Sequence, residues 1–286
     1  LGNRDKPILN QPVPAPPADF VVMESTYGDR NHKSQADSIA EFRQVIQTTL
    51  ARGGNIVIPT FALERAQDLL YYLREMLEAK LLAPQTPVFL DSPMAISATD
   101  IFRRHTECFN PNTAALLTSG HDPFALPHAS FTRDGQASRA IANVSGAIIM
   151  AGSGMATGGR ILHHLVNNLP EERNSILFVG YAAAGTPARK IIEGAHEIKL
   201  YGEVVPVRAQ IHTIGGFSAH AGHDDLLAWV KSSRAQRIFL VHGEASAAQV
   251  LARDLNAAGL TAQIPRLGQS VNLGDDNAGE KVITGP

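Results

Sequence analysis

The sequence contains a single cysteine, Cys108, among its 286 residues. One thiol cannot form a disulfide within the chain, and it cannot supply the several thiolates of a cysteine-based zinc site. Scarcity of cysteine is typical of proteins from a reducing compartment. The composition therefore favours a cytoplasmic location.

Long hydrophobic runs and an excess of one charge are also missing. The longest apolar run, residues 147–151, has the length of a strand rather than of a membrane helix, and residues 1–5 show no secretory leader. Lys and Arg total 25 against 27 Asp and Glu, a net charge of −2. We therefore expect no membrane partner, and no global field that would attract nucleic acid.

The sequence does contain a regular alternation of short apolar runs with amphipathic helical patterns. This alternation predicts an α/β fold in which helices flank a largely parallel sheet. Ser34 and Asp37 form a capping pair for the first helix. Residues 105–140 show no clear period and are expected to wrap the surface. The predicted strands cover residues 20–23, 56–58, 87–90, 147–151, 176–179 and 238–241.

Near residue 200 the pattern changes to short strands, which suggests a second structural unit. The strand expected at 209–214 and the one at 238–241 are separated by a helix at 223–232. A right-handed connection would place these two strands side by side in one sheet. The tail after residue 268 is rich in Gly, Asp and Asn and is expected to be loose.

Three polar residues lie at or near predicted strand ends, where open α/β sheets bind ligands. Glu24 follows the first strand, and its carboxylate could orient a histidine or simply belong to a turn. His220 and His242 follow the two strands of the second unit, only 22 residues apart. If these strands are neighbours, both imidazoles converge on one site.

A glycine-rich segment, residues 152–160, lies between a strand and a helix. Glycines let backbone N–H groups approach an anion, although a tight turn would need them equally. The segment lacks the lysine of a P-loop and the last glycine of a dinucleotide fingerprint. No nucleotide cofactor is therefore expected.

Clustered metal-ligand motifs are absent from the sequence. Neither His-x-His nor His-Glu-x-x-His occurs, and His163 and His164 are adjacent on a predicted helix, where they point in different directions. By itself, this chain is not expected to assemble a dinuclear metal site.

Three short motifs, in this order and spacing, resemble those of the β-CASP branch of the metallo-β-lactamase fold, a family of RNA-processing nucleases. They are Glu-Ser-Thr-Tyr-Gly at 24–28, Phe-Ser-Ala-His at 217–220 and Leu-Val-His-Gly-Glu at 240–244. The resemblance implies a metallo-β-lactamase-fold segment at 1–28, a β-CASP domain at 29–205, and the C-terminal part of the αββα metallo-β-lactamase fold with its tail at 206–286.

The resemblance also implies roles for individual residues. His220 would donate a proton to the leaving oxygen, Glu24 would hydrogen-bond that histidine, and His242 would be a zinc ligand. The remaining implied residues are substrate contacts: Ser153, Gly154, Ser218 and Arg65, the last being equally compatible with an ordinary helix surface. The implied activity is zinc-dependent hydrolysis of RNA with two zinc ions. Proteins of this family often form homodimers, so the resemblance also implies a homodimer.

One departure from the family pattern is large. The His-x-His-x-Asp-His loop of the family is not in this sequence and would precede residue 1. We therefore expect the chain alone to bind zinc weakly or not at all and to be inactive. The alternatives are a non-catalytic RNA-binding or assembly subunit of an RNA-processing complex and, less compatible with these motifs, a hydrolase of small esters.

Overall fold

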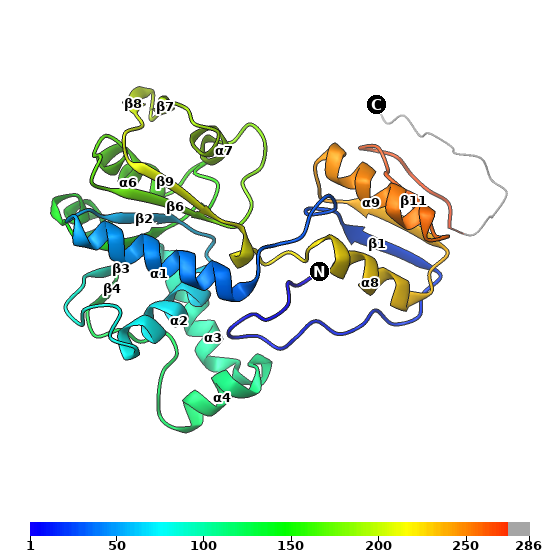
Figure 1. The fold of residues 1–286 in the computed structure, drawn as a ribbon, viewed down its shortest axis with the longest axis horizontal. Helices are drawn as coiled ribbons and strands as arrows, with labels where there is room; N and C mark the ends of the chain where they lie inside the picture. Colours follow the sequence, from blue (N-terminus) through cyan, green and yellow to red (C-terminus); the bar gives the residue numbers. More distant parts are fainter. Residues whose placement is uncertain (274–286) are drawn as a thin grey trace. The chain divides into compact units, whose positions relative to one another are not determined.

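The computed structural model describes residues 1–273, which form two compact units (Figure 1). The larger unit comprises residues 5–10 and 33–219. The smaller comprises residues 1–4, 11–32 and, within the described part of the chain, 220–273. Most of the tail predicted to be loose, residues 274–286, lies outside the described residues.

The larger unit is built on a six-stranded sheet in which every pair of neighbours is parallel. Its inner strands are continuous apolar runs, as expected for strands covered on both faces. In spatial order the strands are β4 (Ala129–Phe131), β3 (Val88–Leu90), β5 (Ile148–Ala151), β2 (Ile56–Pro59), β6 (Ser175–Val179) and β9 (Gln210–Ile214).

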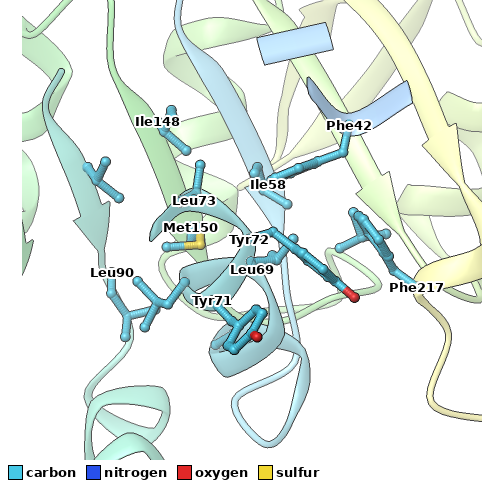
Figure 2. Packing of buried hydrophobic residues seen from close by; sticks show 14 of the residues in the cluster. Phe42, Ile58, Leu69, Tyr71, Tyr72, Leu73, Leu90, Ile148, Met150 and Phe217 are labelled. Carbon is cyan, nitrogen blue, oxygen red and sulfur yellow. The ribbon is translucent and has the colours of Figure 1, made fainter. Parts of the chain in front are cut away.

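Helices cover both faces of this sheet, and alternate residues of one strand show which helices lie on which face. Ile56 and Ile58 pack with α1 (Gln35–Ala51), α2 (Arg65–Glu78) and α3 (Pro93–Arg104), as Figure 2 shows for Ile58. Val57 instead packs with α6 (Ile161–Asn168) and α7 (Pro187–Ile192). The α/β fold with helices flanking parallel strands is therefore confirmed.

Local signals in the sequence explain where the first helix begins. Ser34 caps α1, because its Oγ accepts a hydrogen bond from the backbone N–H of Asp37 at 3.0 Å. The Ser34 hydroxyl also donates to the Asp37 carboxylate at 2.7 Å. The predicted capping pair is thus confirmed.

The segment expected to be irregular contains short elements instead. They lack a clear apolar period because they are brief and half-exposed, as β4 is. These elements are η1 (Thr106–Cys108), α4 (Pro111–Thr118), β4, α5 (Gly135–Ala140) and η2 (Ile141–Asn143). Beyond α7, the hairpin of β7 (Glu197–Leu200) and β8 (Glu203–Pro206) forms a separate two-stranded sheet.

The neighbouring strands β5 and β2 lie at the centre of the large sheet, but the chain leaves them in opposite directions. After β2 it runs through α2 to β3, and after β5 it runs through α6 to β6. Right-handed crossovers in opposite directions place α2 and α6 on opposite faces, in agreement with the two packing clusters. The carboxyl ends of β2 and β5 therefore form the topological switch point of the sheet.

The smaller unit contains a parallel sheet of three strands, β1 (Phe20–Glu24), β10 (Arg237–Val241) and β11 (Thr261–Gln263), in that order. Helices α8 (His223–Ser233) and α9 (Ala245–Ala257) contribute Leu226 and Leu251 to a core that includes Met23 and Leu240. Among the helices of residues 1–273, none has the length and apolar character needed to cross a membrane.

The division into units differs from the predicted boundaries at 28, 205 and 206. β9 pairs with β6 along its whole length, and η3 (Gly215–Phe217) follows it within the larger unit. The expectation that the strand before His220 would lie beside the 238–241 strand was therefore wrong, since β10 pairs with β1 and β11. The unit boundary falls at residue 219, after the short strands rather than before them.

Candidate functional site

Two strand ends meet in the smaller unit. β1 and β10 are parallel, and Glu24 lies opposite Val241 in their register. The polypeptide therefore leaves both strands at the same end of the sheet. The Ser25 hydroxyl donates to the carbonyl oxygen of Val241 at 3.0 Å. A Cβ on Gly243 would lie 2.4 Å from Ser25 Oγ, so only glycine allows this approach. The close pairing brings Glu24 and His242 to one place.

The Glu24 carboxylate makes polar contacts through both of its oxygens. One of its oxygens accepts from the amino group of Leu1 at 2.7 Å, and the other lies 2.5 Å from Nδ1 of His220. Burial raises the pKa of Glu24, but hydrogen bonds, above all the one from His220, outweigh it and lower the pKa to about 2. Glu24 is therefore a carboxylate at neutral pH.

His220 and His242 lie side by side. Their rings stack with centroids 5.3 Å apart and an angle of 28° between the planes. Ligand atoms of Glu24, His220 and His242 all lie within 4.8 Å of one another. The structure thus brings together the three residues that the motifs singled out, although the strand that precedes His220 belongs to the other unit.

Two further side chains support the histidines and had not been singled out from the sequence. The Thr26 hydroxyl donates to the carbonyl oxygen of His242 at 3.0 Å and lies 3.2 Å from Nδ1 of the same residue. His32 Nε2 donates to the carbonyl oxygen of His220 at 2.9 Å. Thr26 stands inside the Glu-Ser-Thr-Tyr-Gly motif, which was its one sequence signal, whereas His32 follows no strand and belongs to no motif.

The donor set suits part of a zinc site. Nitrogen and carboxylate oxygen are ordinary zinc ligands, but structural and catalytic sites use three or four protein ligands. Glu24 and His220 are bonded to each other, which leaves His242 to ligate. Its Nδ1 faces Thr26, so Nε2 is the atom that would bind a metal. Within residues 1–273 this is the one group of three or more potential ligands.

The glycine-rich segment, predicted to approach an anion, follows β5 in the larger unit. Ser153 Oγ accepts from the backbone N–H of Thr157 at 3.1 Å, which closes the loop on itself. The Arg160 side chain donates to Asp91 and to the carbonyl oxygens of Thr132 and Arg133, so it braces the loop. Ser153 and Gly154 lie at the carboxyl end of β5, beside the switch point.

The two other predicted substrate contacts are buried. Ser218 is 2% exposed and lies in the larger unit. Arg65 is 3% exposed, and its guanidinium donates to Asp68 at 3.0 Å. Asp68 also binds the amino group of Lys6 at 2.7 Å. Arg65 therefore lies neither on a helix surface nor in reach of a ligand in this conformation, because a buried ion cluster holds it inside.

Comparison with known families identifies these units. Residues 66–191 match the family model of the Beta-Casp domain. Residues 204–265 match that of the Zn-dependent metallo-hydrolase RNA specificity domain. The chain contains a Beta-Casp domain. The second match spans the boundary at residue 219, so family domain and compact unit do not coincide here.

Several curated proteins are similar to this chain. Ribonuclease TTHA0252 from Thermus thermophilus is 40% identical over 272 residues, which cover 95% of the chain and 62% of the relative. Transcription termination factor FttA from Thermococcus kodakarensis is 36% identical over 80% of the chain and 37% of the relative. FttA from Pyrococcus abyssi is 33% identical over 90% and 41%. The chain thus spans between about a third and two thirds of these relatives.

Proposed function

We propose that this chain contributes Glu24, His220 and His242 to the zinc-dependent hydrolysis of RNA phosphodiester bonds. The observation that carries the proposal is the 2.5 Å contact between Glu24 and His220 Nδ1, beside the exposed ring of His242. The names of the relatives, a ribonuclease and transcription termination factors, favour RNA as the substrate.

The geometry suits His220 for proton transfer. With Nδ1–H donated to Glu24, the opposite ring nitrogen, Nε2, is the one that can give a proton to a leaving oxygen. The carboxylate of Glu24 accepts this Nδ1–H, which fixes the orientation of the ring. Glu24 thus acts as the positioning residue of this proton donor.

His242 would hold the metal through Nε2, with further ligands from the His-x-His-x-Asp-His loop that the family implies. Zinc bound there would supply positive charge for the phosphate oxygens. Two zinc ions in the complete site are part of this proposal. Ser153 and Gly154 remain the proposed substrate contacts, and Ser218 and Arg65 are withdrawn from them because both are buried.

A cleavage assay tests the proposal, using a protein that contains this chain together with that loop. Single-stranded RNA and zinc are supplied, and His220→Ala is compared with the unchanged protein. Loss of a general acid lowers kcat by roughly 10²- to 10⁴-fold. The matched control is His105→Ala, because His105 also pairs with a carboxylate, Glu107 at 2.8 Å, but on an exposed surface. Full activity of His220→Ala would remove His220 from the mechanism.

A second candidate is a non-catalytic RNA-binding or assembly subunit, and one observation favours it for the chain alone. The described residues offer one group of potential metal ligands, in which two members bind each other. Metal analysis of the purified chain separates the candidates. We expect substoichiometric zinc, whereas a tightly bound zinc pair would show that this polypeptide completes the site itself.

The remaining expectations belong to the same proposal: a cytoplasmic protein that pairs with a second copy of itself. Light scattering of the purified protein measures the mass in solution. A mass of about one chain across the accessible concentration range would exclude the homodimer.

A further inference from the structure

An aromatic side chain is exposed at the switch point of the large sheet. Phe61 stands two residues after the end of β2 and is 43% exposed, although most large apolar residues of this unit are buried. A single exposed apolar side chain is common on protein surfaces, so the exposure of Phe61 gains meaning only from what surrounds the ring.

The ring of Phe61 lies directly against the glycine-rich segment. A Cβ built on Gly154 would be 2.7 Å from two ring carbons, Cδ2 and Cε2. No other residue could stand at position 154 without pushing the ring away. The aromatic face and the backbone of residues 153–154 are therefore parts of one local structure, contributed by the neighbouring strands β2 and β5.

The topology places this pair where an α/β sheet receives its ligand. The segments after β2 and β5 diverge to opposite faces of the sheet, and ligands bind outside the carboxyl ends of two such strands. Exposed apolar side chains accompany the ring on the same edge, since Leu63 is 66% exposed and Met94, at the start of α3, is 74% exposed. The edge offers apolar surface next to a loop of backbone amides.

We propose that Phe61 is a stacking platform for a base of single-stranded RNA, while the adjacent backbone and Ser153 lie along the sugar–phosphate chain. This inference rests on the proposed function and names the part of the RNA that the larger unit recognises. Aromatic stacking accepts any base because every base has a π face, and the near-neutral net charge of the chain leaves little affinity to a general basic surface.

Binding measurements on this chain test the proposal. The probe is a short single-stranded oligoribonucleotide with a fluorescent end label, followed by anisotropy. Stacking on one aromatic ring is worth about 5- to 100-fold in affinity, so Phe61→Ala should weaken binding by that factor. Phe61→Trp should bind as well as the parent. Phe61→Leu keeps an apolar side chain without the ring and should bind as weakly as Phe61→Ala.

A matched control and an altered RNA make the test specific. Tyr201, between β7 and β8, is an aromatic residue of the same unit that is 66% exposed, and Tyr201→Ala should leave binding unchanged. Replacing each nucleotide in turn by an abasic one should reveal a position that weakens the parent as much as Phe61→Ala does. Phe61→Ala should bind this abasic RNA as tightly as it binds the unmodified RNA, because the stacking partner is already lost.

The outcomes distinguish this inference from the proposed function. Unchanged binding by Phe61→Ala, or by Phe61→Leu, would overturn the stacking role while leaving RNA as the substrate. No binding of RNA by the parent chain would overturn the inference, and with it RNA binding by this part of the protein. Cleavage that depends on His220 but not on Phe61 would retain the nuclease and reject the platform.

Discussion

Among the carboxylate–histidine pairs of residues 1–273, two have a carboxylate that is less than 10% exposed, and their surroundings differ. In the smaller unit, Glu24 lies 2.5 Å from His220, whose side chain is 35% exposed. In the larger unit, Asp91 lies 2.7 Å from Nε2 of His164, and both side chains are completely buried. The two contact distances are similar and do not tell the pairs apart.

The partners of each carboxylate do separate them. Asp91 also accepts from the Ser138 hydroxyl at 2.6 Å and from Arg160 at 2.7 Å, so its two oxygens connect the end of β3 with α5 and α6. Burial raises the pKa of Asp91, but the hydrogen bonds from His164, Ser138 and Arg160 outweigh it and lower the pKa. A buried hub of this kind fixes the fold, whereas an imidazole with an exposed edge can exchange a proton with a ligand.

The largest expected effect comes from breaking the buried pair. Asp91→Asn removes the charge that compensates Arg160, and loss of one member of a buried ion pair costs about 3–5 kcal/mol. Urea unfolding followed by circular dichroism measures the change. Fluorescence of Trp229 follows the unfolding of the smaller unit separately. The transition that it reports should shift less, because Asp91 lies in the larger unit.

A surface pair provides the control for Asp91. Asp100 is 48% exposed and binds Arg103 and Arg133, so Asp100→Asn should change the free energy of unfolding by less than about 1 kcal/mol. If Asp91→Asn cost no more than Asp100→Asn, the structural interpretation of the buried pair would be wrong.

The second effect is a pH dependence of the smaller unit. The pKa of Glu24, about 2, lies below the 4.5 of a free glutamate, so folding binds fewer protons at this site. The stabilisation is complete above pH 4.5 and is lost as the pH falls toward 2. Unfolding followed by Trp229 fluorescence at neutral and acidic pH measures its size.

Two variants sharpen this measurement. Glu24→Gln should be less stable at neutral pH and should lack this loss at acidic pH. Asp225→Asn, which removes a surface ion pair with Arg4, should keep the pH dependence of the parent. An identical acid profile for Glu24→Gln would mean that other carboxylates produce the effect.

The same contrast shows what the sequence could predict about the site. Strand-end reasoning pointed to Glu24 and His242, since apolar runs mark β1 and β10 and parallel strands end at one edge. The place of His220 came from the family motif, because the predicted strand neighbour proved to belong to another sheet. Thr26 and His32 contact residues that are distant in the sequence. Contacts of this kind leave no local sequence pattern from which they could be predicted.

The buried charges were the least predictable feature of the larger unit. Arg65 stands on α2 like many surface arginines, and its burial depends on Asp68 and on Lys6, which is distant in sequence. The sequence places His164 on a helix with no sign of a special role. Only the hydrogen bond with Asp91 in the folded chain shows that it belongs to a buried carboxylate–histidine pair. The fold itself was easier, because long apolar strands and helix caps are local signals.

The smallest expected effect concerns the second nitrogen of each histidine. Nδ1 of the buried His164 has no hydrogen-bond partner among residues 1–273, whereas Nδ1 of His242 faces Thr26. Since the Thr26 hydroxyl donates to the carbonyl oxygen of His242, it can only accept from that ring, which holds the proton on Nδ1 and leaves Nε2 unprotonated.

Thr26→Val should remove the preference for this tautomer and lower the free energy of unfolding by about 1 kcal/mol. Thr26→Ser should preserve both the tautomer and the stability. Nitrogen NMR of the imidazoles measures the tautomer directly, and spectra of His242 that are the same in Thr26→Val and the parent would show that threonine does not set the ligand atom.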